Sequence, residues 1–206
     1  MGRYTGPTDK LSRREGVNLM LKGARSESGK LERNMVPPGP RRWRRGRVSD
    51  YGIRLREKQK VKRYYGVRER QFMKYFHMAE RQRTDTGAAL LSLLERRLDN
   101  VVHKLGLAPS RPSARQLVTH GHVYVNGRRV NIPSFSVDVG DRVAVKSSER
   151  SQKLVRANLE ELGEPRLQNW LQLDMTKLEG QIIATPTRDD VMIPVEEQLI
   201  VEFCSK

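Results

Sequence analysis

The fold is set by the segment Ser113-Ala114-Arg115-Gln116-Leu117-Val118-Thr119-His120-Gly121-His122-Val123-Tyr124-Val125-Asn126-Gly127-Arg128-Arg129. Ser113 and Gln116 have the spacing of a helix capping box, so they predict a short helix over 113–120 that ends at Gly121. Alternating apolar residues over 123–125, followed by the strong turn signal Asn126-Gly127, predict a β-hairpin. A further alternating strand is expected at 143–145. The segment therefore indicates a helix followed by a small antiparallel sheet.

Apolar residues with helical spacing predict more helices on the N-terminal side, over 11–21, 52–65, 67–81 and 86–105. Asp50 is the expected cap of the second, and Gly66 its expected end. The third has one apolar face, made of Phe72, Tyr75, Phe76 and Ala79. A leucine-rich stripe runs through the fourth, which should end at Gly106.

The C-terminal part of the chain is mixed in its pattern. It predicts a helix over 153–162, strands over 170–175 and 181–185, and a final helical face. The residues of that final face are Val195, Leu199, Ile200 and Phe203.

Charge divides the chain more sharply than hydropathy does. The 206 residues carry a net charge of +16, and successive quarters (1–50, 51–100, 101–150, 151–206) carry +8, +7, +5 and −4. A polyanion should therefore meet the first three quarters.

The lone Cys204 excludes a disulfide framework and a zinc site built on several thiolates. Apolar runs long enough to span a membrane or to form a signal peptide are absent, so we expect a cytoplasmic protein.

Cations near the helix-to-hairpin corner suit folded RNA, which is recognised largely through shape and phosphates. Arg111, Arg115, Arg128 and Arg129 can grip phosphates, and His120 and His122 can donate or stack beside them. A single arginine is as often a solvated charge, but the cluster together favours RNA. The run 41–47, with five arginines around Trp43, reads as a basic arm that orders against its partner.

Other constellations compete with the RNA interpretation. His120 and His122 could ligate a metal, but no third ligand is nearby. Asp99 follows Arg97-Leu98, as the catalytic aspartate of pseudouridine synthases does, yet it falls inside a predicted helix. Two rival functions stay open: an accessory domain of an RNA-modifying or aminoacylating enzyme, and a DNA-binding regulator that inserts the 113–120 helix into a major groove.

Several motifs resemble one family in their order along the chain. Arg96-Arg97-Leu98-Asp99-Asn100, the 113–122 segment and Val125-Asn126-Gly127 look like the RNA-binding module named after small-subunit ribosomal protein S-four. Outside the module, the stretches 11–16, 49–60, 65–72 and 199–202 resemble the ribosomal protein family itself. The resemblance covers the whole chain and is specific to the bacterial-type S-four family.

The resemblance implies an α+β fold, with a mostly helical domain and an inserted RNA-binding domain of helix-turn-helix and small antiparallel sheet. The implied domains are a basic arm over 1–48, a helical domain over 49–94 completed by a helix over 193–206, and an inserted domain over 95–192 with its module core at 95–158. It also implies a non-enzymatic protein that binds a multi-helix junction in the five-prime domain of small-subunit ribosomal RNA and nucleates subunit assembly. Implied partners are protein S-five and messenger RNA near its entry path, with a contribution to translational accuracy.

One departure from the family concerns a cofactor. Many members carry four cysteines near the N-terminus that hold zinc or an iron–sulfur cluster, whereas the matching region here has residues such as Thr8, Ser12, Ser26 and Leu31. We therefore expect no cofactor. A cytoplasmic ribosome is the expected location, with an organellar ribosome as the alternative.

The candidate RNA-binding residues form one set. It comprises Arg3, Lys10, Arg13, Arg14, Arg41, Arg42, Trp43, Arg44, Arg45, Arg47, Ser49, Tyr51, Lys58, Lys60, Lys62, Arg63, Arg111, Ser113, Arg115, Gln116, His120, His122, Asn126, Arg128 and Arg129.

Overall fold

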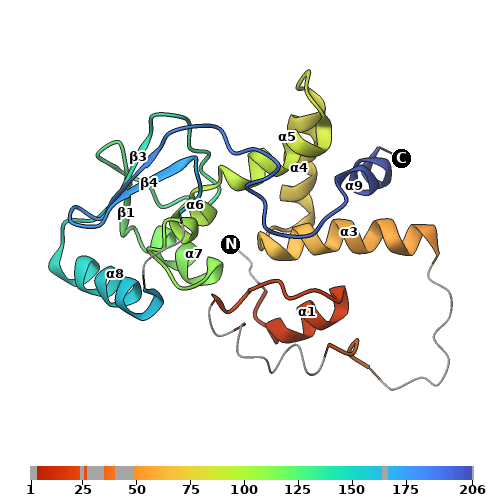
Figure 1. Ribbon diagram of the computed structural model, residues 1–206, viewed down its shortest axis with the longest axis horizontal. Helices are drawn as coiled ribbons and strands as arrows, with labels where there is room; N and C mark the ends of the chain where they lie inside the picture. The colour runs from red at the N-terminus through yellow and green to blue at the C-terminus, as the bar shows by residue number, and fades with distance from the viewer. Residues whose placement is uncertain (1–3, 24–25, 27–34, 40–48, 164–166, 206) are drawn as a thin grey trace. The chain divides into compact units, whose positions relative to one another are not determined.

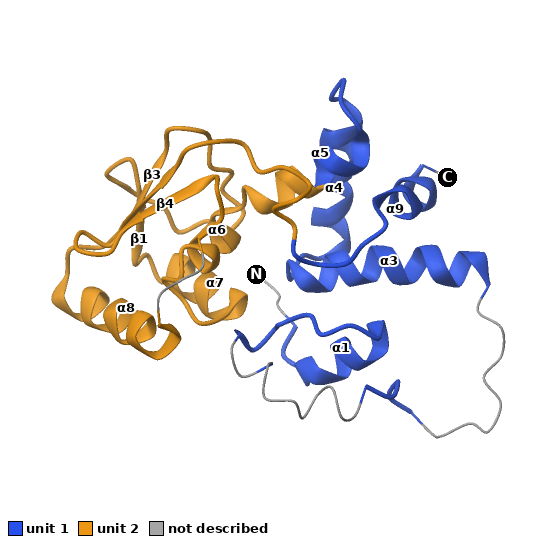
Figure 2. Ribbon diagram, viewed as in Figure 1, with its two compact units in different colours: residues 1–90, 192–206 blue, residues 91–191 orange. Residues whose placement is uncertain are grey.

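The computed structural model describes residues 4–23, 26, 35–39, 49–163 and 167–205. The chain divides into two compact units, residues 1–90 with 192–206 and residues 91–191 (Figure 2). The described residues form eight helices and one five-stranded antiparallel sheet (Figure 1), which confirms the predicted α+β class. The finer domain boundaries inferred from the sequence stay a prediction.

Unit 1 is helical. It contains α1 (Thr8–Glu15), α3 (Asp50–Tyr64), α4 (Glu69–Glu80), the first half of α5 (Thr86–Glu95) and α9 (Glu197–Cys204). The predicted apolar face of α4 is confirmed, because Phe72, Tyr75, Phe76 and Ala79 are all buried. α9 packs along α3 although about 130 residues separate them in sequence, and α1 lies against α3 as well (Figure 1).

Both ends of α3 are set by residues next to the helix, Ser49 at the start and Gly66 at the end. Ser49 is its N-cap, with its hydroxyl accepting a hydrogen bond from the Gly52 N–H at 3.2 Å, so the expected cap at Asp50 is wrong by one residue. Asp50 instead sits in the first turn, where a carboxylate favours the positive end of the helix dipole. Gly66 follows with φ +61, as predicted for the residue that ends the helix.

The N-terminal helix differs from its prediction. α1 ends at Glu15, because Gly16 takes a left-handed conformation with φ +70, so the chain has already turned before the expected end at residue 21. The following residues pack without helical structure: Leu19 has no exposed surface, and its N–H donates to the Ser12 hydroxyl at 3.3 Å. The described residues 4–23 are thus part of unit 1, whereas the run 41–47, expected to order against its partner, lies outside the described residues.

Unit 2 holds the second half of α5, three further helices and the sheet. The helices are α6 (Leu98–Lys104), α7 (Arg111–Thr119) and α8 (Glu149–Leu162). The strands are β1 (Val123–Val125), β2 (Arg128–Arg129), β3 (Arg142–Val145), β4 (Leu171–Asp174) and β5 (Glu179–Ile182). Their order is β2-β1-β3-β5-β4, so β1 is flanked by its hairpin partner and by β3. β5 begins two residues earlier than expected and α8 four residues earlier.

The hairpin turn is confirmed in its details. Asn126 and Gly127 have φ +50 and +76, the pair of positive values that a type I′ turn needs. Val125 pairs with Arg128 across the turn and with Val143 on the other side.

The core of unit 2 lies between the helices and the sheet. α6 and α7 contact each other beside the sheet (Figure 1), and Val101, Leu105 and Val118 have no exposed surface. A Cβ at Gly180 would lie 2.5 Å from the Leu105 side chain, so only glycine lets β5 approach α6 this closely. The core thereby holds the helices rigidly against the hairpin.

The predicted helix over 86–105 is wrong as a single element. It breaks into α5 and α6 at Arg96 and Arg97, because these backbone groups pair with the loop before β3. The Leu98 N–H donates to Phe135 O at 2.8 Å, and the Val137 N–H donates to Arg96 O at 2.9 Å. The leucine stripe continues through the break, which is why the sequence pattern hides it.

None of the helices that the structure describes is both long and apolar enough to cross a lipid bilayer.

Candidate RNA interface

The first turn of α7 positions the candidate surface. Ser110 is its N-cap, and its hydroxyl accepts from the Ser113 N–H at 3.4 Å, so the predicted capping box of Ser113 with Gln116 is wrong. Pro112 lies in the first turn, where its missing N–H and fixed φ are tolerated. The Ser113 N–H is therefore satisfied within the first turn of α7. Gly121, with φ +72, ends the helix as expected.

Arg111 and Arg115 lie against the protein more than against solvent. Arg111 is only 8% exposed, and its Nε donates to Asn100 Oδ1 at 2.9 Å. Arg115 Nη1 lies 3.1 Å from Asp99 Oδ2, and the same carboxylate also pairs with the buried Arg97 at 2.6 Å. Both arginines therefore hold α7 to α6. Asp99 is a buried, doubly paired carboxylate, which fits a structural role better than a catalytic one.

Basic side chains gather where α7 turns into the hairpin. We call it the hairpin corner: His120, His122, Arg128, Arg129 and Lys146. The rings of His120 and His122 are 6.2 Å apart, and the Lys146 N–H donates to His122 O at 2.8 Å. Arg128 and Arg129 are exposed. The Arg129 guanidinium packs over Gly121, where a Cβ would come within 2.3 Å of its Nε.

The basic residues of the hairpin corner disfavour the protonated form of His122. Partial burial lowers the pKa of His122, and the neighbouring His120, Lys146 and Arg129 lower it further. The groups that act on His122 are thus all basic, and none of them is a carboxylate. A polyanion bound here would relieve their mutual repulsion. The ring is fixed by Ser151, whose hydroxyl lies 2.9 Å from His122 Nδ1.

Asn126 is occupied within the hairpin. Its Nδ2 donates to Asp141 Oδ1 at 2.7 Å, and its Oδ1 accepts from the Arg142 N–H at 2.9 Å. These bonds tie the turn to the start of β3. The structure therefore gives Asn126 a role in shaping the interface, and its predicted contact with RNA stays untested.

The predicted basic face of α3 is largely neutralised inside unit 1. Lys58 and Lys62 both pair with Glu69, and Lys60 lies 2.5 Å from Glu57. Lys58 and Lys60 are below 9% exposed. Paired, buried ammonium groups are poorly placed to meet a phosphate, so α3 offers less positive surface than its sequence suggests.

Arg63 and Arg56 converge on a single carboxylate. Both pair with Glu15 at the end of α1, and the Glu15 side chain has no exposed surface. Burial raises the pKa of Glu15 despite the surrounding cations Arg63, Arg56, Lys60 and Arg14. The cluster attaches α1 to α3.

The remaining N-terminal candidates are scattered. Lys10 and Arg14 are exposed, whereas Arg13 Nε donates to Val36 O at 2.9 Å. Ser49 caps α3, and the exposed Tyr51 stacks on Phe203 with ring centroids 5.3 Å apart. Arg3 and the predicted arm (Arg41, Arg42, Trp43, Arg44, Arg45 and Arg47) lie outside the described residues.

Serine hydroxyls of the N-terminal region form hydrogen bonds to the backbone. Ser12 accepts from the Leu19 N–H, and the Ser26 hydroxyl accepts from the Lys22 N–H at 3.0 Å. Hydroxyls thus close the turns in this region through hydrogen bonds. Across the described ranges, no group of three or more histidine, cysteine, aspartate or glutamate side chains could hold a metal ion. The expectation of no cofactor stays a prediction.

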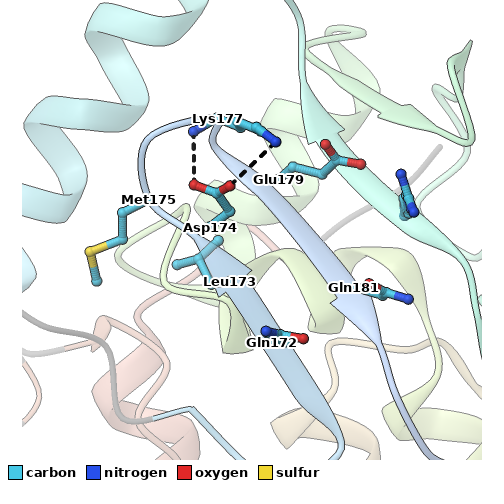
Figure 3. Close-up of a pocket in the computed structure, with 8 residues that line it drawn as sticks. Gln172, Leu173, Asp174, Met175, Lys177, Glu179 and Gln181 are labelled. Atoms are coloured by element: carbon cyan, nitrogen blue, oxygen red, sulfur yellow. Dashed lines mark hydrogen bonds and ion pairs between the residues drawn. The ribbon is translucent and has the colours of Figure 1, made fainter.

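The outer strands of the sheet carry an open pocket of about 550 Å³ with mixed charge (Figure 3). Asp174 and Lys177 face each other across the β4–β5 turn, 3.9 Å apart, and Asp174 Oδ1 also accepts from the Lys177 N–H at 3.1 Å. Asp174 and Lys177 thus satisfy each other, and with Arg142 and Glu179 beside them the lining carries both signs of charge. Cys204 is also a poor nucleophile, because burial raises its thiol pKa.

Sequence reasoning missed Lys146, which belongs to the hairpin corner. It follows β3, and β3 pairs with β1 so that Val123 lies opposite Val145. A strand pairing assigned in advance would have brought Lys146 beside His122. The signal was therefore present in the predicted strands but needed their register.

Comparisons with known proteins agree with this geometry. A model of the family described as ribosomal protein S4/S9 N-terminal domain matches residues 3–95, and one described as the S4 domain matches residues 96–143. The second match contains α6, α7 and the hairpin.

Full-length relatives match both units together. The chain is 52% identical over 208 residues to small ribosomal subunit protein uS4 of Halothermothrix orenii. It is 50% identical over 209 residues to uS4 of Thermus thermophilus and 51% identical over 209 residues to uS4 of Desulfitobacterium hafniense. Each alignment covers 100% of both chains.

Proposed function

We propose a function that proceeds from one premise: the chain belongs to the family of small ribosomal subunit protein uS4. It is a structural, non-enzymatic protein of the small ribosomal subunit that binds ribosomal RNA. Its partners are the ribosomal RNA and the ribosome, where it is located. The earlier alternative of an RNA-modifying enzyme is thereby excluded.

The finer proposal concerns where and when it binds. The protein binds a multi-helix junction in the five-prime domain of small-subunit ribosomal RNA and nucleates assembly there. It contacts protein S-five, lies near the messenger RNA entry path, and contributes to translational accuracy. It works without a cofactor in a cytoplasmic ribosome. These statements extend the family assignment and rest on the resemblance of the motifs.

The hairpin corner is the observation that best supports direct RNA binding. It gathers exposed arginines and two imidazoles on a hairpin that the core of unit 2 holds rigidly. Guanidinium groups on a fixed backbone can grip phosphates in two-point contacts. Arg128 and Arg129 are better probes than Arg111 or Arg115, because they have no comparable contact with α6.

A competition titration tests the proposal. The protein would bind a labelled fragment of the five-prime junction, competed by a scrambled RNA of equal length and by a DNA duplex, at several salt concentrations. We expect selective retention of the junction fragment and a steep salt dependence. Preference for the DNA duplex would favour the DNA-binding alternative, and equal competition by all three would contradict specific recognition.

Two pairs of variants that remove the same charge test whether RNA binds at the hairpin corner. Arg128→Gln with Arg129→Gln should weaken junction binding and reduce the magnitude of the slope of log K against log salt by about 2, roughly one per lost phosphate contact. Lys153→Gln with Arg156→Gln removes the same charge from the exposed side of α8 and should change the slope less. Equal effects of the two pairs would show that the hairpin corner is not a specific contact.

A further inference from the structure

The solvent side of α4 carries cations outside the predicted RNA-binding set. The cations are Arg70, Lys74 and the C-cap residue Arg81, and the imidazole of His77, which lies 3.4 Å from the Glu80 carboxylate, falls between them. Their intervals of four, three and four residues place all four side chains on one face. The buried residues of α4 lie on the opposite face. We call the exposed face the α4 stripe. Its length is about 16 Å, from 11 residues at a rise of 1.5 Å each.

The α4 stripe differs from α3 in how its charges are balanced. The cations of α3 pair with Glu15, Glu57 and Glu69. Within the described part of the chain, no ion pair joins Arg70, Lys74 or Arg81 to a carboxylate, and all three side chains are exposed. Glu69, on the flank of the stripe, is already taken by Lys58 and Lys62. The α4 stripe therefore keeps three exposed cations that no carboxylate of the described residues neutralises.

Two methionines complete the surface. Met73 and Met78 flank the cations and line with them an open groove of about 590 Å³. Met78 is 43% exposed. Flexible thioether side chains adapt to irregular partners, and their apolar surface can pack beneath a ribose or a base edge. The α4 stripe thus combines cations that can bind phosphates with the flexible apolar side chains of Met73 and Met78.

We propose that the α4 stripe is a second RNA-binding surface, which takes the phosphate backbone of folded small-subunit ribosomal RNA. The inference rests on the proposed function and adds a contact in unit 1 to the hairpin corner of unit 2. A row of like charges on a straight, rigid helix suits a strand, because phosphates repeat along it with one sign of charge. An acidic protein surface is the other occupant that the charge would attract, and its presence is an outcome of the test below.

The test compares two triple variants of the full chain. The first is Arg70→Gln, Lys74→Gln and Arg81→Gln, which keeps the exposed, helix-compatible character of each position. The second removes the same charge from the acidic last quarter of the chain by Lys153→Gln, Arg156→Gln and Lys177→Gln, all at exposed positions. Both are titrated with the labelled junction fragment between about 50 and about 200 mM salt, a range over which counterion release changes the affinity strongly.

The stripe variant should reduce the magnitude of the salt slope by about 2 to 3, one for each lost phosphate contact. The control variant should change it by less than about 1. Equal slopes for the two variants would overturn the inference and leave the stripe to a protein partner. Selectivity of the wild-type protein for the junction over scrambled RNA reports separately on the proposed function, so the two can fail independently.

A second measurement uses the wild-type protein, so its result does not depend on whether the variants fold. Acetylation of lysines would be compared with and without the junction fragment. Lys74 should be protected by RNA, whereas Lys153, also exposed and on α8, should react at an unchanged rate. Unprotected Lys74 at saturating RNA would overturn the inference.

Discussion

The Glu95 carboxylate lies inside unit 2 without exposed surface, at the point where α5 ends. Lys104 Nζ pairs with it at 2.9 Å and also donates to Gln168 Oε1 and to Asp190 O. Asn100 donates to the same carboxylate at 2.6 Å and accepts from Arg111. Buried charges are tolerated when every polar atom has a partner, as these have. This network explains why Arg111 contributes to the interior of the module.

His103, the neighbour of Lys104, should make the stability of unit 2 depend on pH. Burial, Arg111 and Lys104 lower its pKa from 6.5 to about 4, while a hydrogen bond to Ala108 O opposes them. Between these two values the unfolded chain binds the proton and the folded chain does not, so the free energy of unfolding falls as pH falls. The total effect is about 3 kcal/mol, of which about 1 kcal/mol is lost by pH 5.5.

Urea unfolding at pH 7.5 and 5.5 would measure this effect. His103→Gln removes the titrating group and keeps a donor for Ala108 O, so its free energy of unfolding should change less across this interval. The prediction is wrong if the variant and the wild-type protein lose the same stability.

At the scale of elements, Gly121 has two roles: it ends α7, and it leaves room for the Arg129 side chain. Gly66 after α3 and Gly121 after α7 both have left-handed backbones, but only Gly121 has a side chain lying where a Cβ would be. That side chain is the Arg129 guanidinium, the flexible end of a long residue. The turn therefore couples the end of a helix to the direction of a candidate phosphate ligand.

Gly66→Ala and Gly121→Ala should separate stability from RNA binding. Each places a Cβ in the left-handed region, which costs roughly 1–2 kcal/mol of unfolding free energy. Only Gly121→Ala also displaces the Arg129 guanidinium, so only it should weaken junction binding. Chemical denaturation and the junction titration measure the two effects. An equal loss of RNA affinity in both variants would contradict the role given to Gly121.

The same elements show what local sequence could predict. The α4 face, the Asn126-Gly127 turn and the glycine stops were predicted because each depends on neighbours within a few residues. The break between α5 and α6 was not, because it depends on hydrogen bonds to residues 133–137, far along the chain. The burial of Lys58, Lys60 and Arg111 was likewise hidden, since their carboxylate and amide partners could not be assigned from spacing. Basic residues in the sequence therefore overstate the positive surface of α3.

At the scale of the whole molecule, the chain returns to complete unit 1 after forming unit 2. α9 packs on α3 through the fully buried Ile200, and Arg54 pairs with Glu202 at 2.8 Å. Lys58 lies 5.1 Å over the Phe203 ring. Unit 1 thus depends on two segments of chain that are far apart in sequence, whereas unit 2 is continuous.

Ile200→Ala should therefore destabilise unit 1 selectively. Removing these buried carbons costs about 2–5 kcal/mol of unfolding free energy. Amide hydrogen exchange should accelerate in α3 and α9 while the protection of β1, β3 and α7 is kept. Ile183→Ala, at a position 51% exposed in unit 2, serves as the control and should leave both patterns unchanged. Equal acceleration in both units would show that they unfold as one.

Because α9 belongs to unit 1 but follows unit 2 in sequence, the order of synthesis determines which unit can be completed first. A ribosome that synthesises this protein releases all of unit 2 before it releases residue 197, where α9 begins. The module can fold while the chain is still growing, but α3 waits for its last partner until synthesis has passed residue 204. A nascent chain would thus present a finished hairpin corner to RNA ahead of a finished helical unit.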